Sequence, residues 1–108
     1  MNRALPLFLP LLALLLCACS RQRDDSPEAF RRTARDVAHT RCTVWSQMIP
    51  RITPAQLKSL CDCVADGAVQ SVNEADLRAY IKDKEFPRAA EQVMHGVRNE
   101  CSRKAGLD

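Results

Sequence analysis

Cysteines and histidines are the residues of this chain whose types and spacing could support chemistry. Cys17 and Cys19 close an apolar run near the N-terminus, and the other four cysteines are spread along a more polar remainder. Thiols can be acylated, joined as disulfides, bound to a metal or used in thiol–disulfide exchange. The compartment and the elements that carry the cysteines decide among these chemistries. The four cysteines of the remainder are Cys42, Cys61, Cys63 and Cys101.

The N-terminal segment has the three parts of an export signal. Arg3 supplies positive charge, and residues 4–16 follow without a polar side chain. This run is too short for a hydrocarbon core that needs roughly twenty helical residues, which disfavours a retained membrane anchor. A basic start, a short apolar run and a small residue before the cut are typical of a cleaved signal peptide. We therefore expect residues 1–18 to be removed.

The end of this run, Leu16-Cys17-Ala18-Cys19, resembles the lipobox of bacterial lipoproteins. The resemblance covers residues 1–19 and implies a lipid on the sulfur of Cys19, cleavage just before it, and acylation of the new amine, commonly with palmitate. Cys17 is the rival anchor, but it follows the bulky Leu16, where the peptidase prefers a small residue. Simple secretory cleavage after Ala18 is the other alternative. No cofactor is expected besides the covalent lipid on Cys19.

The same resemblance implies a place in the bacterial cell envelope, with the lipid anchor as the contact with the membrane. Ser20 follows the anchor where an aspartate would retain a Gram-negative lipoprotein, so we expect the outer membrane, facing the periplasm. Residues 19–26 are predicted to be the lipidated cysteine and a polar tether. Residues 20–26 reach at most about 25 Å when extended. A single helical domain is expected over residues 27–108, since a chain of this size has room for one domain.

Helix signals organise that domain. Ser26-Pro27 predicts a first helix that ends at Pro50, and Thr53-Pro54-Ala55-Gln56 is a capping box that opens a second. Asn73 predicts a short third helix, and Pro87 starts a last one that frays near Gly106. Apolar residues recur at helical spacing, and no alternating strand pattern is present. We therefore predict an all-α fold: a small bundle of three to four helices stapled by two disulfides. Trp45 and Met48 are expected in its core.

Four cysteines in an oxidising compartment predict two disulfides. Cys61 and Cys63 cannot bond to each other within a regular helix, so each must bond to another segment. Cys42 and Cys61 lie at similar distances from the turn that joins the first two antiparallel helices. This position along the helices favours Cys42 with Cys61 and Cys63 with Cys101. The facing of the apolar stripes favours Cys61 with Cys101 and Cys42 with Cys63 instead. We favour the first pairing.

Metal binding and thiol-redox chemistry are the competing interpretations of these cysteines. His39 lies three residues before Cys42, and imidazole with thiolates would suit zinc or copper(I). No Cys-x-x-Cys motif is present, however, and Asp62 between Cys61 and Cys63 would raise a thiol pKa. No metal site is therefore predicted. A metal-binding or redox lipoprotein that uses Cys61 and Cys63 remains the alternative function.

Other function classes leave no signature in the chain. The formal net charge of +3 comes from scattered residues rather than a basic stripe, so no nucleic-acid partner is expected. No hydrolase or phosphate-loop motif is present, and we expect no enzyme. The preferred function is a small protein-binding module for another envelope protein. The lipoprotein resemblance allows an assembly subunit, an inhibitor or an immunity-type factor. The candidate partner-binding residues are Tyr80 and Phe86, which flank the short helix.

Overall fold

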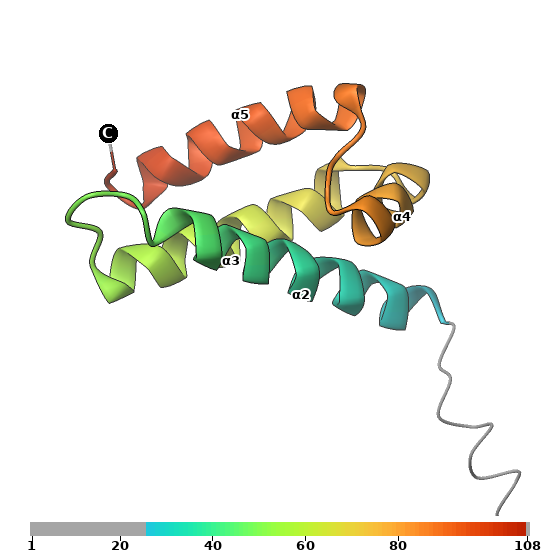
Figure 1. Ribbon diagram of the computed structural model, residues 1–108, viewed down its shortest axis with the longest axis horizontal. Coiled ribbons are helices and arrows are strands. Elements are labelled where there is room, and N and C mark those ends of the chain that lie inside the picture. Colours follow the sequence, from blue (N-terminus) through green and yellow to red (C-terminus); the bar gives the residue numbers. More distant parts are fainter. Residues whose placement is uncertain (1–25, 108) are drawn as a thin grey trace, which may run out of the picture.

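The structure is a computed structural model that describes residues 26–107. The predicted signal peptide, the predicted acylation site Cys19 and the predicted tether before Ser26 lie outside the described residues. The described part forms four helices and no strand, which confirms the all-α prediction (Figure 1). The helices are α2 (Pro27–Ser46), α3 (Pro54–Ser71), α4 (Glu74–Asp83) and α5 (Arg88–Lys104). No helix between residues 26 and 107 combines the length and apolarity needed to cross a membrane.

Local capping signals set the helix starts as predicted. The Ser26 side chain caps α2, and Thr53 and Gln56 form a reciprocal capping box at the start of α3. In that box the Gln56 backbone N–H donates to the Thr53 hydroxyl at 3.1 Å, and the Thr53 N–H donates to the Gln56 amide oxygen at 3.0 Å. Asn73 caps α4 by accepting from the Asp76 N–H at 2.8 Å. These bonds satisfy N–H groups that lack an intrahelical partner.

Helix α2 ends at Ser46, four residues before the proline that was expected to end it. Pro50 has no N–H to donate to the Ser46 carbonyl, and its ring would clash with that carbonyl. The helical hydrogen-bond pattern therefore stops one turn early, and residues 47–51 form a turn. Arg51 takes a positive φ of 63° in this turn, which redirects the chain into α3.

Helix α3 is the centre of the bundle. Helices α2 and α5 each pack along α3 but make little contact with each other. Both run antiparallel to α3 and therefore parallel to each other (Figure 1). Helix α4 lies across one end, where Arg78 sits 4.3 Å above the ring of Phe30 and joins α4 to α2.

Small side chains let the helices approach closely. The buried residues of the α2–α3 contact include four alanines that are at most 4% exposed. Gly67 of α3 faces Val97 of α5 so closely that a β-carbon at Gly67 would collide with the valine side chain. The close approach of α3 and α5 is therefore built on the missing side chain of Gly67. The four alanines are Ala34, Ala38, Ala65 and Ala68.

Both disulfides bond α3 to a neighbour. Cys42 of α2 is joined to Cys61 with the Cα atoms 5.4 Å apart. Cys63 is joined to Cys101 of α5 with the Cα atoms 5.7 Å apart. This pairing is the one predicted from the positions of the cysteines along their helices, and not the alternative predicted from the apolar stripes. Successive side chains on α3 point in different directions, so the Cys61-Asp62-Cys63 segment serves both neighbours at once.

Candidate functional site

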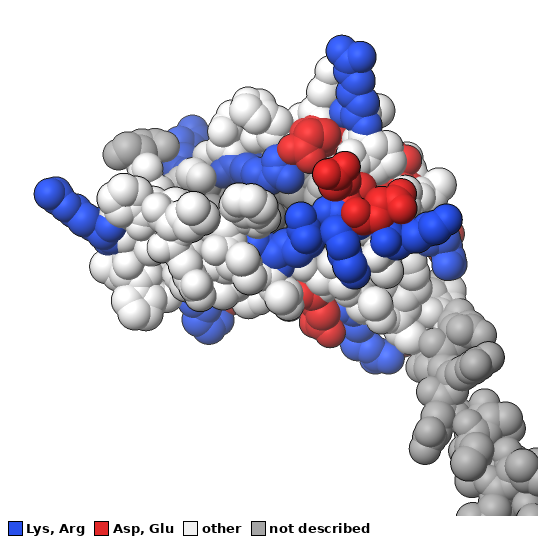
Figure 2. Space-filling view, viewed as in Figure 1, with Lys and Arg blue, Asp and Glu red and all other residues white. Residues whose placement is uncertain are grey.

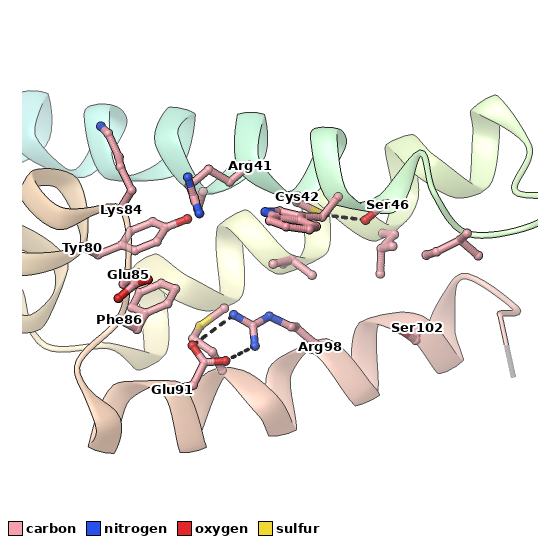
Figure 3. A pocket seen from close by; sticks show the side chains of 16 residues that line it. Arg41, Cys42, Ser46, Tyr80, Lys84, Glu85, Phe86, Glu91, Arg98 and Ser102 are labelled. Carbon is pink, nitrogen blue, oxygen red and sulfur yellow. Dashed lines mark hydrogen bonds and ion pairs between the residues drawn. The ribbon is translucent and has the colours of Figure 1, made fainter.

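The separation of α2 and α5 leaves a groove between them with α3 as its base (Figure 3). Its volume is about 610 Å³, within the usual range of binding clefts. Side chains from all four helices and the α4–α5 connection line it.

The floor of the groove is apolar. Leu60 and Val64 of α3 and Met94 of α5 line it, and each is at most 6% exposed. Cys42 adds its disulfide sulfur to the same surface. The Ser46 hydroxyl lies 3.5 Å from the Cys42 sulfur, which can only accept a hydrogen bond in a disulfide, so the hydroxyl donates. The Ser46 hydroxyl, which also lines the groove, thus has a hydrogen-bond partner within the protein.

The prediction about the apolar residues at the end of α2 is wrong. Trp45 and Met48 were expected in the core, but they are 64% and 74% exposed. Trp45 does lie on the helix face that the apolar spacing indicated, because it lines the groove with Ala38. Within residues 26–107 this face is left open, since α5 makes little contact with α2. Val44 is 60% exposed as well, and we refer to these three exposed apolar side chains around the end of α2 as the Trp45 patch.

The predicted binding residues Tyr80 and Phe86 lie at the closed end of the groove. Their rings are stacked, with centroids 3.8 Å apart and planes 2° from parallel. Tyr80 is only 5% exposed, whereas Phe86 is half-buried. Burial raises the pKa of the Tyr80 phenol above its ordinary value, although Arg41 acts in the opposite direction. The phenol therefore stays protonated at neutral pH, and the ring pair supports the core while it walls the groove.

Two arginines enter the groove from opposite walls (Figure 3). Arg98 of α5 is held by both carboxylate oxygens of Glu91. Arg41 of α2 forms no ion pair within residues 26–107 and lies near the Tyr80 hydroxyl. The groove thus contains one neutralised guanidinium and one that lacks a carboxylate partner in the described chain.

Charge and apolar surface are separated on the face that carries the groove. Charged side chains gather over α4 and the start of α5, whereas the surface over the end of α2 is mostly uncharged (Figure 2). The groove runs between these regions, with Lys84 and Glu85 at its closed end and the Trp45 patch near the turn. The groove therefore has a charged end near α4 and an apolar end near the turn that follows α2.

The remaining candidate residues for chemistry lie along the α2–α3 contact, outside the groove. Asp62 accepts from Lys58 at 2.6 Å and lies 2.9 Å from Nε2 of His39. These two bonds, the one from Lys58 first, lower the pKa of Asp62. Asp66 pairs with Arg35 at 2.7 Å. The two aspartates, one helical turn apart, are thus engaged in ion pairs between or along helices.

Together the two disulfides use all four described cysteines, which leaves no free thiol within residues 26–107 for metal binding or thiol exchange. Cys61 is fully buried and Cys63 half-buried, each bonded to a different helix. His39 is hydrogen-bonded to Asp62, and His95 is exposed. Within residues 26–107, no three histidine, cysteine or acidic side chains come together as a set of metal ligands. The arrangement of the cysteines in the described chain is that of structural crosslinks.

Sequence reasoning did not identify the groove or the position of Arg41. A signal for them was present, since α2 places its small side chains on one stripe and Arg41, Trp45 and Met48 beside it. A helix with small core residues packs closely against one neighbour and leaves its large apolar residues to the side. Only the orientation of α5 then decides whether those residues are covered, and the sequence does not specify it.

In comparisons with known proteins, the chain matches no protein-family model, no curated protein and no solved structure.

Proposed function

We propose that this protein is a lipid-anchored envelope protein whose helical domain binds a protein partner through the groove between α2 and α5. The observation that carries the proposal is the exposure of Trp45, Val44 and Met48 beside an apolar groove. Tryptophan is among the residues most enriched in the energetic centres of protein interfaces. A contiguous exposed apolar patch rimmed by polar residues is typical of an interaction surface.

The groove suits binding rather than catalysis. Its lining within the described residues includes guanidinium groups, carboxylates, hydroxyls and a protonated phenol, but no histidine or free thiol. Nucleophilic catalysis requires a nucleophile and a base within hydrogen-bond reach of each other. A firm contact instead requires apolar area and a few charges that fix the orientation of the partner, and the groove offers both.

The proposed anchor sets where the partner must be. Trp45 lies near the end of α2, about 27 Å along the helix axis from Pro27. The tether before the helix adds at most about 25 Å. Under this proposal the groove works within about 50 Å of the membrane surface. The partner is then either a membrane protein with a periplasmic part or another anchored protein, which fits an assembly subunit, an inhibitor or an immunity-type factor.

Site-specific photocrosslinking in intact cells tests the proposal. A photoreactive phenylalanine analogue replaces Trp45 on the α2 wall or Ser102 on the α5 wall, and Asn99, exposed on α5 outside the groove, serves as the matched control. We expect both groove positions to crosslink to the same envelope protein and Asn99 to give no such product. Equal crosslinking from Asn99, or none from either groove position, would contradict the proposal.

A further inference from the structure

One additional helix would fit the groove between α2 and α5. Helices α2 and α5 lie parallel to each other on α3 and make little contact with each other, so α3 side chains between them line an open groove. Helices in contact have axes about 8–10 Å apart, and a helix laid over α3 would contact both walls. The groove therefore suits a helical segment better than an extended strand, because a strand would need a free sheet edge to pair with.

We infer that the groove accepts one amphipathic α-helix of a partner protein, and that this helix carries a carboxylate that pairs with Arg41. The inference rests on the proposed function and specifies the chemistry of the partner.

The apolar part of the groove matches about three helical turns. Lining residues of α5 extend from Glu91 to Ser102, a rise of about 16 Å along the helix. Apolar side chains at positions i, i+3, i+4 and i+7 of a docked helix would cover this length. They would meet Leu60, Val64 and Met94 below and Trp45 at the side. The stacked Tyr80 and Phe86 close one end, which limits how far the helix can extend in that direction.

Arg41 specifies the charge of the docked helix. A helix that fills the groove removes water from Arg41, and a guanidinium buried without a partner is costly. Arg98 on the opposite wall already has Glu91. Lys84 at the closed end forms no ion pair within residues 26–107, but the adjacent Glu85 carries the opposite charge, so these two residues add no net charge there. Arg41 is left as the groove cation that needs an external carboxylate, and the Tyr80 hydroxyl beside it can donate to the same oxygen atoms.

Selection from a random peptide library tests this inference without knowledge of the natural partner. The full chain is reconstituted in phospholipid vesicles and used to select phage-displayed peptides of sixteen random residues. We expect enriched peptides to share apolar residues at helical spacing and one Asp or Glu at a fixed position relative to them. Enriched peptides that contain proline or alternate apolar and polar residues, or that lack the acid, would overturn the inference, as would a selection without enrichment.

The single tryptophan of the chain reports occupancy of the groove directly. Binding of a selected peptide without tryptophan should shift Trp45 emission to the blue. Its affinity should fall about tenfold when its acid is changed to the neutral amide. Arg41→Gln should cause the same loss, with little further loss when both changes are combined. Arg31→Gln, an exposed arginine of the same helix outside the groove, is the matched control and should leave the affinity unchanged.

Three results distinguish failure of this inference from failure of the proposed function. Independent, additive losses from the two changes would remove Arg41 as the partner of the acid. Quenching of Trp45 by brominated lipid without peptide would identify the membrane as the occupant, and this would also overturn the helix. If both groove positions crosslink to one envelope protein but the selected peptides are not helical, the protein-binding function stands and the helical partner is wrong. The change in the peptide leaves the protein intact, so this test does not depend on the folding of Arg41→Gln.

Discussion

The same substitution at two glycines should change stability in opposite directions. Gly67 and Gly96 both lie inside helices, where alanine is favoured over glycine by about 1 kcal/mol. At Gly96 a new β-carbon meets nothing within 4 Å. At Gly67 it would overlap Cγ1 of Val97 and lie 3.5 Å from Cγ2. Val97 cannot turn away easily, because a β-branched side chain in a helix has one strongly preferred rotamer.

The magnitudes follow from these environments. Gly96→Ala should stabilise the domain by about 0.5–1 kcal/mol. Gly67→Ala gains the same helix preference but adds an overpacking cost of about 1–3 kcal/mol. The free energies of unfolding of the two variants should therefore differ by about 1–3 kcal/mol, or roughly 4–20 °C in melting temperature for a domain of this size.

Urea unfolding followed by circular dichroism, with both disulfides kept oxidised, measures this difference. Val97→Ala in the Gly67→Ala background should recover part of the loss, because it removes the methyl groups that collide. Equal stabilisation by the two alanines would refute the close approach of α3 and α5 at Gly67. A loss that Val97→Ala does not reduce would refute its cause.

Four further predictions concern the anchor, the staples, the aromatic pair and one ion pair. Cys19→Ala should abolish incorporation of labelled palmitate and membrane retention; incorporation lost only in Cys17→Ala would move the anchor to Cys17. Reductant should lower the melting temperature of a soluble chain starting at Ser20 by more than 10 °C, since each crosslink contributes about 2–4 kcal/mol; equal melting of both forms would remove the stapling argument. Alanine at both Tyr80 and Phe86 should destabilise the domain by about 3 kcal/mol or more, because Tyr80 is buried; a loss of partner capture with a melting change of only a degree or two would instead assign both rings to the interface. The pKa of Asp62 is lowered by Lys58 and His39, so its stabilising effect should be present above the ordinary carboxyl pKa and lost as pH falls through the lowered value. Because the Asp62 side chain is 35% exposed, that effect should stay below about 1 kcal/mol in unfolding titrations, and an Asp62→Asn variant with the same pH profile would contradict it.

Features that depend on neighbouring residues were predictable from the sequence. The caps at Ser26, Thr53 and Asn73 use hydrogen bonds within one turn, and the structure contains all three. The disulfide pairing was predictable because the position of each cysteine along its helix follows from counting residues from the turn, and the turn is short. The argument from apolar stripes was wrong because it treated Cys61 and Cys101 as facing each other, whereas Cys63 is the residue that α5 meets.

Features that depend on the relative placement of distant helices were not predictable. Trp45 lies on the face of α2 that its spacing indicated, yet it is exposed because none of the four described helices covers it. Val93 of α5, another large apolar residue, is likewise 43% exposed. Spacing identifies the side of a helix that prefers burial. Whether a second helix reaches that side depends on packing angles, which are set by contacts such as Gly67 with Val97.

The order of the disulfides along the chain has a consequence for how the protein matures. Cys42 is joined to the next cysteine, Cys61, and Cys63 to the next after it, Cys101, so neither crosslinked loop encloses the other. Under the proposed export, an oxidant that joins thiols in the order in which they leave a translocation pore would therefore produce the native pattern without reshuffling. A free thiol at Cys19 would disturb this order, because it would emerge first and compete for Cys42. Under the proposed anchoring, the lipid blocks that thiol and thereby protects the first crosslink.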